Sequence, residues 1–284
     1  MLMAAIMAML SAAGCASARP LVDPPQIQTH RVLRVAHRGG AGFAPENTMA
    51  AFRAGIEAGA DTLELDVHLS RDGRLVVIHD PILARTTNQS GSVSDYDLAT
   101  LKSFDATARY FGAMFPRQEI PTLEEVLQLV LSVPDRVLAL QVEIKVRKDG
   151  SRYEGIEAEL VRILRLNHYV EHTTVLSFDF PSLRTIAEIE PGLRTCALAG
   201  QQYLAAFGVA GPDAVADAIA ALGVDCAGVS EKFLGKLLYN ALRGKGLGVG
   251  AWTVDDPVRM RELAVLGVDF ITSNRPDILV QVFP

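Results

Sequence analysis

The chain is poor in cysteine and aromatic residues, and it has no excess of positive charge. Three cysteines in 284 residues are too few for a disulfide-stabilised scaffold. The 27 lysines and arginines are outnumbered by 33 aspartates and glutamates, which gives a net charge of −6. Binding to nucleic acid is therefore not expected, because a polyphosphate partner requires clustered positive charge. Apolar residues make up 49% of the chain and exclude disorder over most of it.

Beyond the N-terminus the chain has no long apolar run, so no other membrane span is expected. Residues 1–18 are uncharged, apolar and small, and Cys15 follows Ala12, Ala13 and Gly14. This order resembles the leader of a bacterial lipoprotein, which is cut before a cysteine that is then acylated. Ala12 replaces the usual leucine, and no lysine or arginine precedes the apolar stretch. The alternative is an apolar N-terminus with an incidental cysteine.

The stretch that follows is typical of a tether. It contains a Pro-Pro pair and shows no amphipathic period. We therefore expect a leader over residues 1–15, a linker over 16–29 and a folded domain over 30–284. If Cys15 is acylated, the protein is exported and anchored by lipid on the periplasmic side of a bacterial membrane.

From residue 30 onward, short β-rich runs alternate with amphipathic helical runs. Eight such units predict an α/β fold, a TIM (β/α)8 barrel. The runner-up is an open doubly wound sheet, but the glycines of residues 39–42 lack the G-x-G-x-x-G spacing of its dinucleotide loop. The expected strands are 31–37, 62–69, 137–146, 173–178, 194–199, 225–230, 247–254 and 269–273, and the expected helices are 46–59, 121–130, 154–166, 181–190, 212–222, 233–243, 256–266 and 276–283.

One interval breaks this alternation. Residues 74–79 are expected to form a hairpin with the second strand, and residues 81–120 then show no clear strand. Within them only residues 97–104 have the pattern of a short helix. We therefore predict a small insertion after the second strand, on the face where barrel active sites form.

Charged side chains gather on two of the predicted strands. Glu64 and Asp66 lie two residues apart and share a face of the second strand, as Glu143 and Lys145 do on the third. Carboxylates pointing together into a barrel would repel one another unless a cation lay among them. Three of them suit a hard divalent ion, Mg²⁺ or Ca²⁺. The alternative is that they point outward and pair with basic side chains of the helices.

Two histidines close neighbouring strands. His37 precedes Arg38 at the end of the first strand, and His79 ends the hairpin strand. They could bind the metal, serve as ordinary polar residues, or act as acid and base, since histidine changes charge near neutral pH. Together with the arginine they suit acid/base work on an anionic substrate. His68 shares the face of the carboxylates but lies further along its strand, and we expect it to take no part.

These residues stand in motifs that resemble the glycerophosphodiester phosphodiesterase family. The two longest are H-R-G-G-A-G-F-A-P-E-N-T at 37–48 and E-L-D-V-H-L-S-R-D-G-R-L-V-V-I-H-D at 64–80. Shorter matches cover the rest of the domain, namely P-T-L-E-E-V-L at 121–127, V-E-I-K at 142–145, A-W-T-V at 251–254 and G-V-D-F-I-T-S-N-R-P at 267–276.

The resemblance implies a TIM barrel with a segment inserted after its second strand. It implies metal-dependent hydrolysis of glycerophosphodiesters to glycerol 3-phosphate and an alcohol. The family's metal ligands match Glu64, Asp66 and Glu143, which would hold one divalent cation, Mg²⁺ or Ca²⁺. Its acid/base pair matches His37 and His79.

The resemblance also implies a phosphate-binding role for Arg38 and for Lys145. Trp252, the single tryptophan, falls where an aromatic wall for the glycerol would stand, with core packing as the alternative. Ser273 and Asn274 replace the Thr-Asp pair of many members. We expect this change to affect only local loop geometry.

No serine or cysteine in these motifs offers a nucleophile. We therefore predict that the glycerol hydroxyl beside the ester attacks phosphorus and forms a five-membered cyclic phosphate. The residues alone do not decide which histidine is the base, and the resemblance to the family favours His37. Two other functions stay open: a phospholipase C or D type of phosphodiesterase, for which Tyr110, Phe111, Met114 and Phe115 could form an apolar rim, and a catalytically retired binding lipoprotein. The sequence gives no sign of the oligomeric state.

Overall fold

The structure is a computed structural model that describes residues 31–107 and 114–284. The predicted leader with Cys15 and the linker lie outside the described residues and stay predictions. Within the described part of the chain, no helix is long and apolar enough to cross a membrane.

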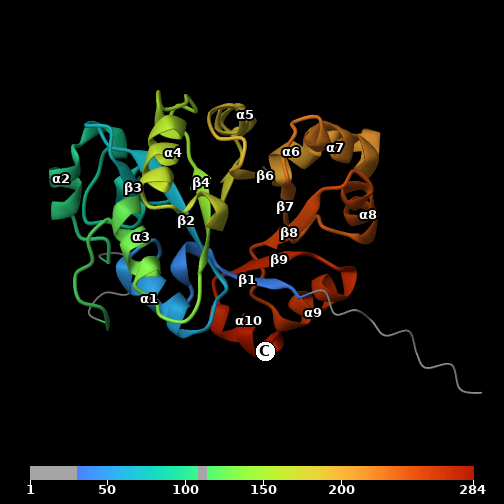
Figure 1. The fold of residues 1–284 in the computed structure, drawn as a ribbon, viewed down its shortest axis with the longest axis horizontal. Helices are drawn as coiled ribbons and strands as arrows, with labels where there is room; N and C mark the ends of the chain where they lie inside the picture. Colours follow the sequence, from blue (N-terminus) through green and yellow to red (C-terminus); the bar gives the residue numbers. More distant parts are fainter. Residues whose placement is uncertain (1–30, 108–113) are drawn as a thin grey trace, which may run out of the picture. The chain divides into compact units, whose positions relative to one another are not determined.

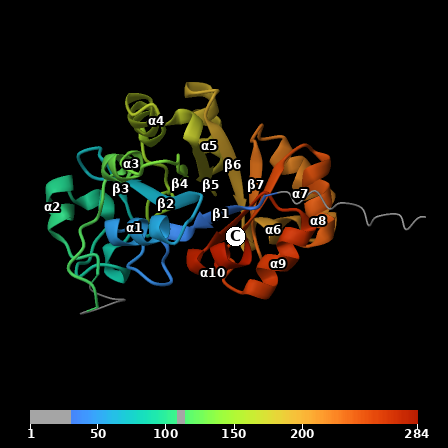
Figure 2. The same ribbon diagram turned by 60° about the horizontal axis from the view of Figure 1, so that its bottom comes forward.

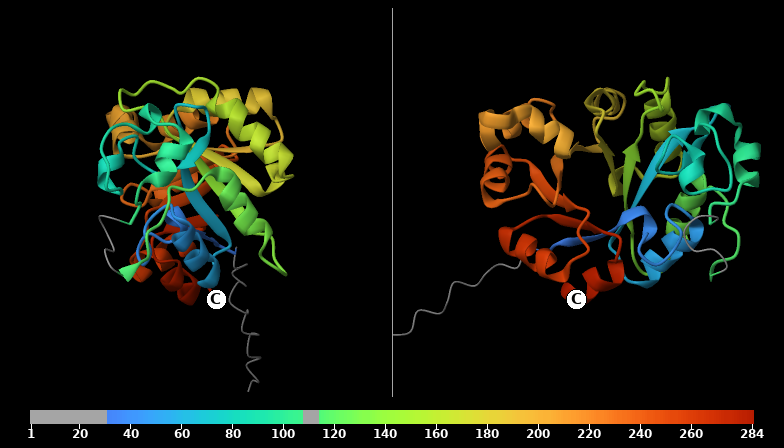
Figure 3. Two further views of the ribbon diagram at one scale, coloured as in Figure 1. Left: turned by 90° about the vertical axis from the view of Figure 1, so that its left-hand side faces the viewer. Right: turned by 180° about the vertical axis from the view of Figure 1, so that it is seen from behind.

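The domain is a closed barrel of eight parallel strands, as predicted (Figures 1 and 3). Neighbours around the ring run β1-β9-β8-β7-β6-β5-β4-β2, and β1 pairs with β2 to close it. The short strand β3 pairs antiparallel with β2 and forms the predicted hairpin. The strands are β1 (Leu33–Ala36), β2 (Thr62–Leu69), β3 (Leu75–Val77), β4 (Ala139–Ile144), β5 (Thr173–Ser177), β6 (Arg194–Ala199), β7 (Cys226–Ser230), β8 (Gly248–Trp252) and β9 (Phe270–Ser273).

Helices cover the outside of this ring (Figure 2). Several begin at a residue whose side chain accepts from the first turn, such as Thr48 before α1 and Asp256 before α9. α6 was not predicted; it is seven residues long and buries none of its side chains fully. The helices are α1 (Met49–Glu57), α2 (Leu98–Ser103), α3 (Leu123–Leu131), α4 (Ile156–Leu166), α5 (Phe180–Ile189), α6 (Gln201–Phe207), α7 (Gly211–Ala220), α8 (Lys236–Gly244), α9 (Pro257–Leu266) and α10 (Pro276–Val282).

The main core lies between the strands and the surrounding helices. Leu63, Leu140 and Val249 on the strands are fully buried, as are Phe52 of α1 and Leu263 of α9. Most of the helices bury their apolar face in this layer. The polar side chains at the carboxyl ends of the strands are therefore held on a rigid frame.

The expected insertion forms a small lobe between β3 and α3, with α2 as its one α-helix among the described residues. It has its own core, in which Leu83, Val93, Leu101 and Phe104 pack on the outer side of β3 and its continuation. Tyr110 and Phe111 of the predicted apolar rim lie outside the described residues.

Candidate active site

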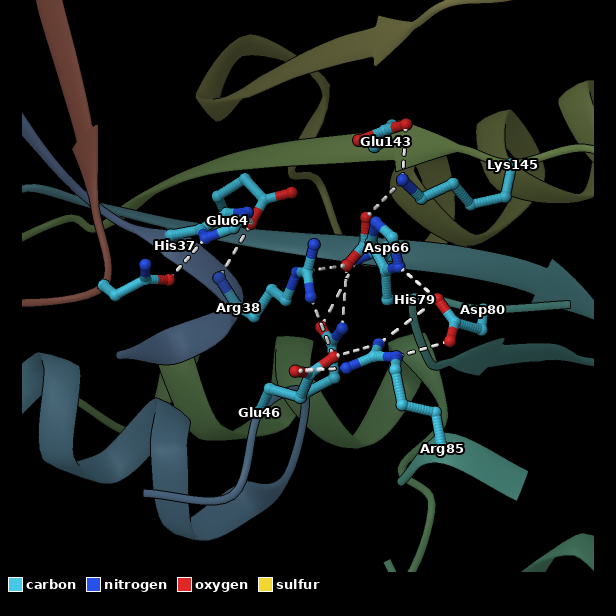
Figure 4. Close-up of polar contacts among 12 residues, drawn as sticks. His37, Arg38, Glu46, Glu64, Asp66, His79, Asp80, Arg85, Glu143 and Lys145 are labelled. Carbon is cyan, nitrogen blue, oxygen red and sulfur yellow. Dashed lines mark hydrogen bonds and ion pairs between the residues drawn. The ribbon is translucent and has the colours of Figure 1, made fainter. Parts of the chain in front are cut away.

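The predicted site residues meet at the carboxyl ends of β1, β2 and β4 (Figure 4). His37 and Arg38 form the short 3-10 helix η1 (His37–Gly39) directly after β1. Register explains why the carboxylates converge. In the β2–β4 pairing, Asp66 lies opposite Glu143, so both side chains point from neighbouring strands into the barrel.

Glu64, Asp66 and Glu143 are buried, and each offers an oxygen within 4.8 Å of the others. The alternative in which they point outward to helix side chains is wrong. Lys145 Nζ lies 3.0 Å from Asp66 Oδ1 and 2.6 Å from Glu143 Oε1. The cluster therefore brings three carboxylates and one ammonium group together at the barrel mouth.

Burial and mutual repulsion change the pKa values of the groups in this cluster. Burial and the charges of Asp66 and Glu143 raise the pKa of Glu64 well above its ordinary value. Burial also raises the pKa of Glu143, against the opposing effect of Lys145. Burial alone would lower the pKa of Lys145, but Asp66 and Glu143 outweigh it and raise the pKa to about 12. The raised pKa values mean that Glu64 and Glu143 bind protons more tightly than free carboxyl groups do. A divalent cation bound between the carboxylates would take the place of these protons, so the site fits such an ion.

Arg38 ties the loop after β1 to this cluster. Its backbone N–H donates to Glu64 Oε2 at 2.7 Å, and its Nε lies 3.5 Å from Asp66 Oδ2. The backbone here has φ of 50° at Arg38 and 83° at Gly39, both in the left-handed region. A Cβ at Gly39 would lie 2.7 Å from the backbone nitrogen of Phe52, so only glycine lets this loop rest against α1.

His37 has a neutral partner. Its Nδ1 lies 2.6 Å from Asn274 Oδ1, in the loop after β9. Burial and the nearby Arg38 charge lower the pKa of His37 to about 4. The expectation that Ser273 and Asn274 affect only local loop geometry is therefore wrong, because Asn274 contacts a predicted catalytic histidine directly.

His79 has a charged partner. Its Nδ1 donates to Asp80 Oδ1 at 2.6 Å. Asp80 also pairs with Arg85, whose guanidinium donates to both oxygens of Glu46, at 2.8 and 2.6 Å. Although burial opposes it, His79 and Arg85 hold the pKa of Asp80 well below its usual range.

This network continues back to Arg38, whose Nη1 donates to Glu46 Oε1 at 2.9 Å. Sequence reasoning did not find Arg85, which lies in the 3-10 helix η2 (Leu83–Arg85) of the insertion. For Asn47 the sequence favoured a loop-fixing role over a contact with the metal ligands, and Asn47 Nδ2 donates to Asp66 Oδ2 at 2.8 Å. The insertion thus supplies an arginine that couples the two loops of the site.

His68 lies behind the site, as expected. Its Nδ1 is 2.9 Å from the Tyr153 hydroxyl, and its Nε2 donates to the backbone oxygen of His79 at 3.1 Å. Burial lowers the pKa of His68 to about 4, so the ring is neutral. It supports the backbone that carries His79.

A pocket of about 100 Å³ opens beside these residues. Its polar wall includes both predicted catalytic histidines, and its apolar wall includes Phe178 and Trp252, whose rings meet edge to face at 5.5 Å. Trp252 Nε1 donates to the Gly228 oxygen at 2.8 Å, which fixes the indole on the wall where the sequence placed it. Gln141, which sequence reasoning missed, also lines this pocket, and its buried Oε1 accepts no hydrogen bond from the described residues.

Comparison with known proteins identifies the family. The glycerophosphoryl diester phosphodiesterase family profile matches residues 37–278. The chain belongs to this family. It is 34% identical over 259 residues to a glycerophosphodiester phosphodiesterase of Caldanaerobacter subterraneus subsp. tengcongensis, an alignment that covers 89% of this chain and 98% of that protein. A Bacillus subtilis protein of the same name is 31% identical over 266 residues, covering 89% and 86%.

Solved structures agree in fold. A glycerophosphodiester phosphodiesterase from Agrobacterium tumefaciens matches with a TM-score of 0.70 and 28% identity, covering 87% of this chain and 98% of that one. An Oleispira antarctica phosphodiesterase in complex with the product sn-glycerol-3-phosphate matches with a TM-score of 0.72 and 25% identity, covering 89% and 96%. The chain is thus a phosphodiesterase with the fold predicted, while the roles of its individual residues stay predictions.

Proposed function

We propose that this enzyme hydrolyses glycerophosphodiesters to glycerol 3-phosphate and an alcohol, with one divalent cation and a histidine acid/base pair. One observation carries the proposal: Glu64, Asp66 and Glu143 converge between two histidines that have different partners. Glu64, Asp66 and Glu143 would hold the cation, Mg²⁺ or Ca²⁺, which supplies positive charge against the phosphate and acidifies a bound hydroxyl.

The remaining basic groups suit a phosphate. Arg38 and Lys145 both line the pocket, and both side chains already contact carboxylates of the cluster. Their charges stabilise the negative charge that builds on the phosphoryl oxygens as the ester bond breaks. The apolar wall of Phe178 and Trp252 packs against the carbon atoms of the glycerol and limits the access of water.

The reaction proceeds in two steps. In the first, His37 Nε2 takes the proton of the glycerol hydroxyl beside the ester, and that oxygen bonds to phosphorus. The bond from phosphorus to the alcohol breaks, and His79 donates a proton to the departing oxygen. In the second, the two histidines exchange roles, and water opens the cyclic phosphate to give glycerol 3-phosphate.

The test is a panel of glycerophosphodiesters with different head groups, followed by phosphorus NMR after chelation and metal add-back. Turnover should vanish with EDTA and return with Mg²⁺ or Ca²⁺. His37→Ala and His79→Ala should each lower kcat on the order of 10²-fold or more. His172→Asn, outside the pocket, serves as the control. A deoxy substrate without the neighbouring hydroxyl should not react, and its hydrolysis at the parent rate would show direct attack by water.

The two alternative functions receive less support. A retired binding protein would be expected to have lost site residues, yet three buried carboxylates cluster here and both histidines, Arg38 and Lys145 line the same pocket. A phospholipase would need an apolar rim for acyl chains. Met114 is 80% exposed, but two of the four residues expected to form that rim lie outside the described part. Hydrolysis of lysophospholipids within the same panel would favour that second function.

We also propose export and lipid anchoring through Cys15, on the sequence pattern alone. Cys15→Ser should move the protein from the membrane fraction to the soluble fraction, or leave it uncleaved. Mass spectrometry of the wild-type N-terminus checks this directly. An unmodified chain that begins at Met1 in the cytosol of its native host would contradict the proposal.

A further inference from the structure

A line of hydrogen bonds runs from the surface to His37. Asp255, in the loop after β8, accepts from Asn274 Nδ2 at 2.7 Å through its Oδ2. Its Oδ1 accepts from the Asn274 backbone N–H at 2.8 Å and from the Ser273 hydroxyl at 2.9 Å. Asn274 Oδ1 in turn lies 2.6 Å from His37 Nδ1. Among the described residues, Asp255 forms no ion pair, so all its contacts here are with neutral donors.

The chemistry of these groups fixes the direction of every bond in the line. An ionised carboxylate can only accept, so the amide of Asn274 must turn its NH₂ group toward Asp255. Its oxygen must then face His37, and an amide oxygen also can only accept. His37 Nδ1 therefore carries a proton. A neutral imidazole has one N–H, so Nε2 is left with a free lone pair.

That free nitrogen is directed at the site. His37 lines the pocket, and its Nε2 lies 4.0 Å from Glu64 Oε2, among the residues that would hold the cation and the reacting hydroxyl. We propose that Asp255, acting through Asn274, holds His37 in the Nδ1–H tautomer and so makes its Nε2 the base. This inference rests on the proposed function, and it makes Asp255 and Asn274 positioning residues rather than catalytic ones.

The other histidine is held differently. His79 Nδ1 donates to the carboxylate of Asp80, which is charged and is fixed by Arg85. A charged acceptor stabilises a ring that carries two protons, which is the form that an acid needs. An amide acceptor gives no such stabilisation, and it suits a ring that begins the reaction neutral. The two partners therefore assign the base to His37 and the acid to His79.

The test reverses the donor and acceptor directions of the hydrogen bonds that join residue 255, Asn274 and His37. In Asp255→Asn, Oδ1 can still accept from the Asn274 backbone, which leaves an NH₂ group facing Asn274 Nδ2. Two donors cannot pair, so the Asn274 amide should turn over and drive His37 into the Nε2–H tautomer. Exchanging the two residues, Asp255→Asn with Asn274→Asp, restores a donor facing an acceptor and returns the proton to Nδ1. Asp256→Asn, at the N-cap of α9 in the same loop, is the matched control.

Nitrogen-15 NMR of the histidine rings reports the tautomer of His37, and His37→Ala assigns its signal. We expect Nδ1–H in the wild type, the control and the exchange variant, and Nε2–H in Asp255→Asn. Turnover of Asp255→Asn should fall on the order of 10-fold to 100-fold, with a smaller change in KM. The exchange variant tests the tautomer alone, because its new carboxylate beside His37 also favours a ring that carries two protons.

Two results would overturn the inference: an Nε2–H ring in the wild type, or an unchanged Nδ1–H ring in Asp255→Asn. An exchange variant that folds but keeps the proton of a neutral His37 ring on Nε2 would also contradict it. Failure of the proposed function is distinguishable, because it would appear as a wild-type protein without turnover whose His37 tautomer can still be read.

Discussion

The buried carboxylates predict an enzyme that is more stable without one of its own predicted metal ligands, provided that no metal is bound. Glu64 is buried, and its pKa is raised by burial and by Asp66 and Glu143. A group whose pKa is raised on folding contributes stability below its unfolded pKa, near 4.5, and that stability is lost as pH rises through the folded pKa. The charged form of Glu64 is therefore a cost to the metal-free protein at neutral pH.

Glu64→Gln removes this charge and keeps an oxygen that can accept from the Arg38 backbone N–H. In EDTA at pH 8 we expect the variant to be more stable than the wild type by about 1–3 kcal/mol, the range for an uncompensated buried polar group. At about 2–4 °C per kcal/mol, this raises the Tm by roughly 2–12 °C. The difference should close as pH falls toward 4.5, where Glu64 of the wild type is protonated.

Divalent cation should reverse the order. At a concentration of a hundred times its Kd, a bound ion stabilises the wild type by about 2.7 kcal/mol, and the variant should gain much less. Calorimetry across pH 4.5–8, with EDTA and with Mg²⁺ or Ca²⁺, measures the stability of both proteins with and without the metal. Glu154→Gln at an exposed site is the control. Equal stabilisation of both proteins by the metal, or a metal-free variant less stable at every pH, would refute this reasoning.

Other contacts lead to three further predictions. Arg85→Ala releases Asp80 and should lower kcat on the order of 10-fold to 100-fold with little change in KM, whereas Arg71→Ala at the surface should leave steady-state kinetics unchanged. Asp61→Asn weakens the pair of hydrogen bonds from the Arg34 guanidinium to the Asp61 carboxylate, and it should lower the free energy of unfolding by urea at pH 7 by about 1–3 kcal/mol. Because Arg34 lowers the Asp61 pKa against the effect of burial, this difference should shrink as the wild type is acidified. Phe178→Ala should raise KM more than it lowers kcat, since the apolar wall binds ground state and transition state alike.

The features that the sequence predicted correctly depend on short-range order. Side chains two residues apart on a strand must share a face, so the spacing of Glu64 and Asp66 was enough to place them together. The eight β/α units are likewise visible as local periodicity, and the closed barrel follows from their number. The convergence of Glu143 with them required only that the second and third barrel strands be neighbours.

The features that were missed depend on contacts between segments that are far apart in the sequence. Asn274 reaches His37 only because β9 pairs with β1 to complete the ring, and nothing in the local sequence of either strand shows that contact. Arg85 lies in an insertion without periodic pattern, so its turn toward Glu46 could not be read from spacing. Asn274 contacts His37 directly, and Arg85 reaches His79 through Asp80, so both contacts join segments that are distant in the sequence.

Under the proposed function, the charges of the site should favour a phosphodiester over a phosphomonoester. The network of hydrogen bonds and ion pairs in Figure 4 contains the carboxylates of Glu46, Glu64, Asp66, Asp80 and Glu143 and the basic groups of Arg38, Arg85 and Lys145. Its carboxylates exceed its basic groups by two, a surplus that one divalent cation would balance. A proton on His79, in the acid role proposed for it, would then leave one net positive charge. A phosphodiester carries one negative charge and neutralises the site, whereas a phosphomonoester carries about two near pH 7. The product therefore brings excess negative charge into a buried pocket, and this repulsion favours its release.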